Sequence, residues 1–102
     1  MSLDFVVLGQ NGAPEKTVSL GVDLHHQLIT VASSQGLKGF QVFEDYYEDA
    51  EVAVEDLRGL VDQVQALRVQ TSSIELQSFL GDLTELIACA MATGRAVHTI
   101  AD

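Results

Sequence analysis

The chain has 102 residues, 47% of them hydrophobic, and its 15 acidic and five basic residues give a formal net charge of −10. This size predicts a single domain over residues 1–102, with a core that needs no metal or disulfide to fold. The charge argues against nucleic acid and anionic membrane surfaces as partners, because binding to phosphate relies on clustered lysine and arginine.

Two segments near the N-terminus predict a β-hairpin. Residues 4–8 form a short apolar run of β-branched and aromatic side chains, which is typical of a strand. Asn11 and Gly12 are a strong turn signal, and Pro14 suits the loop better than the strand ladder. Residues 17–22 then alternate strictly between apolar and polar, as a half-buried strand does. The hairpin is therefore expected to have a loop longer than the minimum.

A short helix and a long connection follow. Apolar residues at helical spacing predict a helix over residues 24–35, with Asp23 as its N-cap and Gly36 as its left-handed stop. Residues 36–53 lack a regular pattern and predict a loop, with room for one helical turn, that places its aromatic side chains on the core. A loop of this length indicates either a functional segment or an element hidden from the pattern.

The C-terminal half predicts a helical hairpin and a final strand. An apolar stripe marks an amphipathic helix over residues 54–69. Ser72 and Glu75 have the spacing of a capping box for the next helix, which ends at Gly94. The β-prone tail at residues 96–100 predicts a strand beside the N-terminal hairpin.

These elements predict an α+β fold. Its three-stranded antiparallel sheet consists of the N-terminal hairpin and the C-terminal strand. Three helices are expected to cover one face of the sheet, and two of them form the helical hairpin.

The sequence predicts a cytoplasmic location. Cys89 is the only cysteine, so no internal disulfide can form, as is usual in a reducing compartment. Residues 1–4 lack the basic and apolar regions of a signal peptide. No apolar run approaches the ~18 residues that a membrane helix needs.

No motif for catalysis or for a cofactor is present. Nucleotide-binding glycine loops, a nucleophile elbow and a calcium loop are all absent from the sequence. Cys89 lies in the apolar pattern of the last helix and is expected to be a small core residue. We therefore predict that the protein is not an enzyme and has no cofactor or metal.

The histidines leave one alternative open. His25 and His26 lie in the first turn of the first helix and, with His98, could in principle bind a metal. Neighbouring side chains on a helix diverge by ~100°, so we expect one of the pair to be packed and the other solvated. The alternative is a small metal-binding protein or enzyme that uses His25 or His26 with nearby acids.

An acidic segment with two central tyrosines is the predicted partner-binding site. Tyrosine is enriched at interface centres, and carboxylates attract and pair with basic partners. Asp23, Glu51 and Asp56 are candidates to extend the patch. The alternative is a solvated loop whose tyrosines anchor it on the core. The predicted site consists of Glu44, Asp45, Tyr46, Tyr47, Glu48 and Asp49.

Several segments resemble small acidic bacterial proteins, namely residues 3–8, 18–25, 45–50 and 100–102. The overall plan is similar to that of the immunity proteins encoded beside polymorphic toxins. This resemblance implies a cytoplasmic protein-binding module that occludes the positive active-site cleft of a basic toxin. A third reading is a structural or regulatory homodimer, completed through the apolar helical hairpin.

Overall fold

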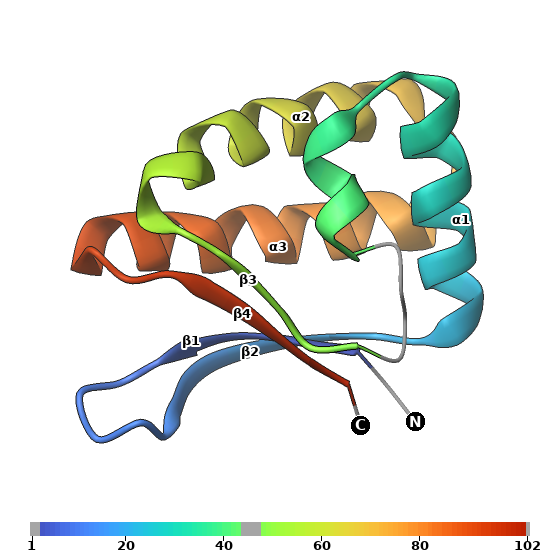
Figure 1. The fold of residues 1–102 in the computed structure, drawn as a ribbon. Helices are drawn as coiled ribbons and strands as arrows, with labels where there is room; N and C mark the ends of the chain where they lie inside the picture. The colour runs from blue at the N-terminus through green and yellow to red at the C-terminus, as the bar shows by residue number, and fades with distance from the viewer. Residues whose placement is uncertain (1–2, 44–47, 102) are drawn as a thin grey trace.

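An antiparallel sheet and a layer of helices make up the structure, a computed structural model that describes residues 3–43, apart from the Val42 side chain, and residues 48–101. Figure 1 shows the helices on one side of the sheet. The elements are β1 (Leu3–Leu8), β2 (Pro14–Leu20), α1 (Val22–Ser34), the 3-10 helix η1 (Lys38–Phe43), β3 (Ala50–Val52), the 3-10 helix η2 (Val54–Asp56), α2 (Leu57–Gln70), α3 (Ile74–Thr93) and β4 (Val97–Ala101).

The sheet has the strand order β2-β1-β4-β3, and all neighbouring strands are antiparallel. The predicted N-terminal hairpin is confirmed, as is the return of the C-terminal strand beside it. At the centre of the sheet, Phe5 of β1 lies opposite Val18 of β2 and Thr99 of β4. Because strand side chains alternate, Phe5 faces the helices while its neighbour Asp4 faces the open side.

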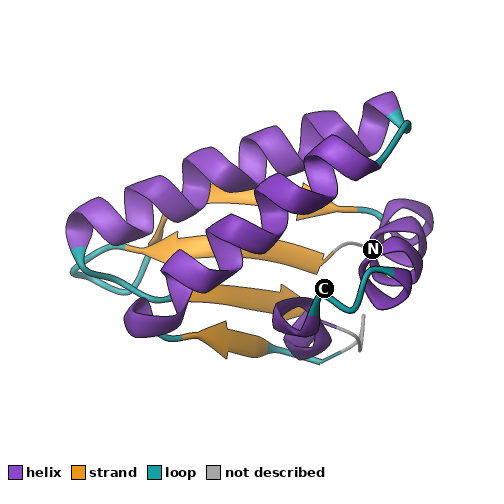
Figure 2. Ribbon diagram, turned by 90° about the horizontal axis from the view of Figure 1, so that it is seen from above, coloured by secondary structure: helices purple, strands orange, loops and turns teal. Residues whose placement is uncertain are grey.

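The helices lie on one face and at one end of the sheet. Figure 2 shows α2 and α3 side by side above the strands, with α3 over β2 and α1 standing at the end of the sheet. Their apolar faces and the sheet enclose one continuous core. Among the described residues, no helix combines the length and hydrophobicity required to cross a lipid bilayer.

Three aromatic rings join the layers. The Phe5 ring meets Phe43 of η1 edge to face with centroids 4.9 Å apart, and Phe79 of α3 at 5.6 Å. Such pairs add about 0.5–1.5 kcal/mol each beyond the burial of their area. Phe5 therefore fixes both the long helix and the end of η1 on the sheet.

The prediction of a three-stranded sheet is wrong, because the described residues form four strands. β3 lies inside the segment expected to be a loop, and pairs Ala50 with Thr99 and Val52 with Val97. Three residues are too few to show strand alternation in a sequence. β3 forms because β4 offers it an unpaired edge. The helical turn allowed for in the same segment is η1.

Two boundaries near the N-terminus also differ from prediction. Pro14 begins β2 instead of lying in the loop, which an edge strand permits because proline needs no ladder donor there. Val22 begins α1 instead of ending the strand, and the N-cap is Gly21 instead of Asp23. Asp23 lies in the first turn, where a carboxylate favours the positive end of the helix dipole.

The predicted helix stops are confirmed, but the predicted cap of α3 is off by one residue. Gly36 and Gly94 have φ values of 69° and 67°, in the left-handed region that ends helices. The N-cap of α3 is Ser73, whose Oγ accepts a hydrogen bond from the Leu76 N–H at 3.2 Å. Ser72 is exposed and precedes the cap.

We expect Ser73→Ala to lower the free energy of unfolding by about 1 kcal/mol, because the Leu76 N–H loses its acceptor at the helix start. Ser72→Ala is the matched control and is expected to change it by less than about 0.5 kcal/mol. Urea denaturation of both variants measures this. If Ser72→Ala lowered the free energy of unfolding more than Ser73→Ala did, Ser72 would be the N-cap, as the sequence predicted.

Candidate functional site

Only the end of the predicted acidic segment lies in the described part of the chain. Residues 44–47, which include both tyrosines, lie outside the described residues, whereas Glu48 and Asp49 are exposed. Asp49 Oδ1 accepts a hydrogen bond from the Ala101 N–H at 2.7 Å. This bond ties the approach to β3 to the end of β4, so Asp49 has a structural role, and the predicted partner-binding site stays a prediction.

The two neighbouring histidines have different environments. His25 is 7% exposed, and its Nε2–H donates to the Phe43 carbonyl at 2.7 Å. This bond links α1 to the last residue of η1. His26 is exposed. The expectation that one histidine is packed and the other solvated is confirmed.

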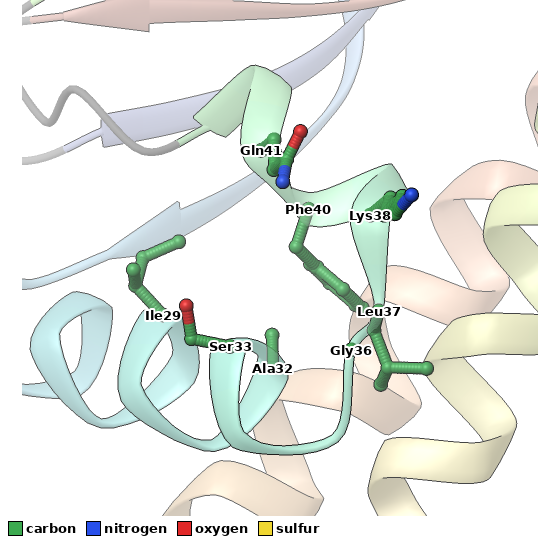
Figure 3. A pocket seen from close by; sticks show the side chains of 8 residues that line it. All are labelled: Ile29, Ala32, Ser33, Gly36, Leu37, Lys38, Phe40 and Gln41. Atoms are coloured by element: carbon green, nitrogen blue, oxygen red, sulfur yellow. The ribbon is translucent and has the colours of Figure 1, made fainter.

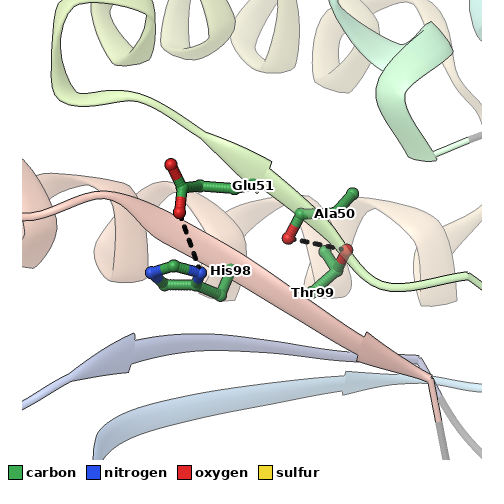
Figure 4. Close-up of polar contacts among 4 residues, drawn as sticks. All are labelled: Ala50, Glu51, His98 and Thr99. Atoms are coloured by element: carbon green, nitrogen blue, oxygen red, sulfur yellow. Dashed lines mark hydrogen bonds and ion pairs between the residues drawn. The ribbon is translucent and has the colours of Figure 1, made fainter. Parts of the chain in front are cut away.

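The third histidine lies on the open face of the sheet. His98 Nδ1 is 3.4 Å from Glu51 Oε2 on the neighbouring strand β3 (Figure 4). Beside them, the Thr99 hydroxyl lies at the limit of hydrogen-bond distance from the Ala50 carbonyl, at 3.5 Å. In the part of the chain that the structure describes, no three histidine, cysteine or acidic side chains converge as metal ligands. The geometry thus offers no support for the metal-binding alternative.

The expectation that Cys89 is a core residue is wrong. Cys89 is partly exposed and lies outside the buried cluster, between the exposed Ala88 and the buried Ala90. Met91, two residues further along α3, is 40% exposed. The last turns of α3 carry apolar side chains on all sides, so some of these side chains lie outside the core and are exposed.

A small pocket opens between α1 and η1. Figure 3 shows the side chains of Ile29, Ala32 and Phe40 around it, and its volume is about 110 Å³. Sites for small ligands usually measure roughly 300–1,000 Å³. This pocket is therefore a packing defect beside the turn at Gly36 and not a ligand site of ordinary size.

A larger groove of about 400 Å³ runs between β3, η1 and α2. Glu51 and Asp56, two of the acids predicted to extend the binding patch, both line it, and so does Lys38. Asp23, the third, does not line it. Gln63 Oε1 accepts a hydrogen bond from the Gly39 N–H at 2.8 Å and closes its inner end. The charged lining residues of this groove are one cation, Lys38, and two acids, and one of these acids, Glu51, lies 3.4 Å from His98.

Another groove, of about 500 Å³, lies between β2 and α3, and we call it the β2–α3 groove. It is lined on the strand side by four consecutive residues of β2 and on the helix side by residues of α3, with Leu24 of α1 at one end. The lining residues are Lys16, Thr17, Val18, Ser19, Leu24, Glu75, Ser78, Phe79, Asp82 and Glu85.

Helical spacing explains the acidic side of this groove. Glu75, Asp82 and Glu85 are separated by seven and three residues, so they project from one side of α3, and all three are exposed. We call these three residues the acidic wall. Phe79 belongs to the core and lines the groove together with the half-buried Val18, whereas most of the other lining side chains are polar or charged. Among the charged lining residues, the acidic wall faces the single cation Lys16.

The sequence did not predict this groove. Glu75 was expected only as part of a capping box, and Asp82 and Glu85 were not candidates for any site. The spacing was visible in the sequence, but it does not show that β2, about 60 residues away in the chain, lies alongside.

Comparisons with protein-family models, with curated proteins and with solved structures give no significant match. The function is therefore argued from the residues and grooves of this chain.

We expect His25→Leu to lower the free energy of unfolding by about 1–3 kcal/mol, since the buried Phe43 carbonyl would lose its donor. His26→Leu, at the neighbouring exposed position, is the control and is expected to stay within about 0.5 kcal/mol of the wild type. Thermal and urea denaturation measure both. Equal stability of the two variants would show that the bond to Phe43 contributes nothing.

Proposed function

We propose that this chain is a cytoplasmic protein-binding module for a basic partner, most concretely an immunity protein that covers the positive active-site cleft of a toxin. The observation that carries the proposal is the β2–α3 groove, where three exposed carboxylates lie around Val18 and the edge of Phe79. The net charge of −10 has the sign that attracts such a partner.

Charge and shape have separate parts in the proposed mechanism. The long-range field speeds the encounter with a positively charged surface, an effect that salt weakens. At short range, lysine or arginine side chains of the partner pair with Asp82 and Glu85. Their aliphatic stems cover Phe79 and Val18 on the floor. A toxin held in this way is blocked by occlusion, without any chemical step.

The segment from Glu44 to Asp49 is the competing site within the same proposal. Its last two residues are exposed beside β3, on the opposite edge of the sheet from the β2–α3 groove. The two surfaces are far enough apart in the topology to be tested separately by substitution. We favour the β2–α3 groove because three exposed carboxylates line one concave surface there.

Three charge variants that change the net charge equally separate these surfaces. They are Asp82→Asn with Glu85→Gln in the groove, Asp45→Asn with Glu48→Gln in the segment, and Glu55→Gln with Asp62→Asn as the control. We expect the groove variant to bind the partner about tenfold more weakly, because it removes two charge pairs with the partner, each worth up to about 1 kcal/mol. The partner is captured from the producing organism at low and at high salt, and is then titrated against each variant.

Loss of binding in the segment variant alone would move the site to the segment of residues 44–49. Equal binding by all three variants, or no captured protein at either salt, would contradict the proposal. The immunity role has its own test. The captured protein should arrest growth when expressed alone, and co-expression of wild-type chain, but not of the groove variant, should restore growth.

A further inference from the structure

One wall of the β2–α3 groove is a free strand edge. Lys16, Thr17, Val18 and Ser19 all line it, although successive side chains of a strand point to opposite faces. A groove that touches all four therefore runs along the main chain. Within the described residues β2 pairs only with β1 in the sheet, so along residues 16–19 alternate N–H and C=O groups point outward to the groove.

The opposite wall matches the dimensions of an extended chain. From Glu75 to Glu85, α3 rises about 15 Å. Alternate residues of a strand are about 6.6 Å apart, so three of them on one side span about 13 Å. Figure 2 shows α3 passing above β2 along the edge of the sheet. A strand added to β2 would thus lie under the acidic wall for most of its length.

We propose that the partner enters this groove as an extended basic segment that adds to β2 as a fifth strand. Lysine or arginine at alternate positions faces the acidic wall, and the main chain pairs with residues 16–19. This inference rests on the proposed function and specifies how the partner binds. Main-chain pairing supplies affinity, and the alternate basic side chains supply specificity.

Charge argues against a second copy of this chain as the occupant. Two copies joined through their β2 edges would bring together two molecules that each carry a net charge of −10. Lys16 also lies on the helix-facing side of β2, opposite Val7 of β1. An inward-pointing charge on an edge strand is a known means of discouraging self-pairing.

The test uses a synthetic ten-residue peptide of alternating lysine and valine, titrated by NMR against the full chain. Two analogues carry N-methyl groups on the lysine residues or on the valine residues. We expect chemical-shift changes at residues 16–19, and slowed exchange of those amides among them that point away from β1. We also expect at least one analogue to bind at least about tenfold more weakly, because alternate N–H groups of an added strand point at its neighbour.

Two charge variants give opposite expected effects. Asp82→Asn with Glu85→Gln should weaken binding of the parent peptide at least about fivefold, and Lys16→Gln should strengthen it about threefold by removing the only cation among the lining residues. Asp62→Asn, an exposed acid on α2 outside the groove, is the control and should match the wild type. Sedimentation of the chain without peptide measures self-association.

The failures are distinguishable. If both methylated analogues bind as tightly as the parent while the groove variant still weakens binding, strand addition is wrong and the proposed function stands. If the groove variant and the Asp62 control bind the peptide equally, both proposals are contradicted. A concentration-dependent dimer with shift changes at residues 16–19 would make a second copy the occupant and overturn the inference.

Discussion

The packing of Phe5 is the interaction on which the rest of the structure depends. Its ring lies in the central strand and contacts Phe79 of α3 and Phe43 of η1 edge to face. One side chain therefore sets the height of the long helix above the sheet and holds the end of η1. His25 fixes the Phe43 carbonyl from the other side. Phe43, the last residue described before the acidic tyrosine segment, is thus held by a ring contact and by a hydrogen bond.

The same contact creates the β2–α3 groove. Phe79 is both a core residue and part of the groove floor, so the packing that stabilises the fold also sets the depth of the groove. With Phe79 directed at Phe5, helical geometry turns Asp82 and Glu85 toward the edge of β2. The position of the acidic wall is a consequence of core packing, and only its charge is free to vary without cost to the core.

Local patterns predicted most of the elements. Each of these elements has a signal within a dozen residues of the sequence, and each is present: the hairpin, the three helices, the glycine stops of α1 and α3, and the final strand. β3 has no such signal, because three residues pair only after β4 is in place. The caps were assigned one or two residues away, since Ser72 and Ser73 offer the same chemistry to adjacent N–H groups. The groove joins β2 to α3 across about 60 residues, and no local pattern carries that information.

Lys16 shows how an exposed edge can be both protected and selective. An open strand edge invites pairing with any extended chain, and a buried or inward charge makes most of those pairings costly. Lys16 makes strand addition to β2 less favourable in general, while the acidic wall across the groove makes it more favourable for a basic segment. The net charge of −10 makes strand addition still less favourable for another copy of the chain. In the proposed binding mode, acidity does more than maintain solubility, because it selects which extended segments can pair with β2 at residues 16–19.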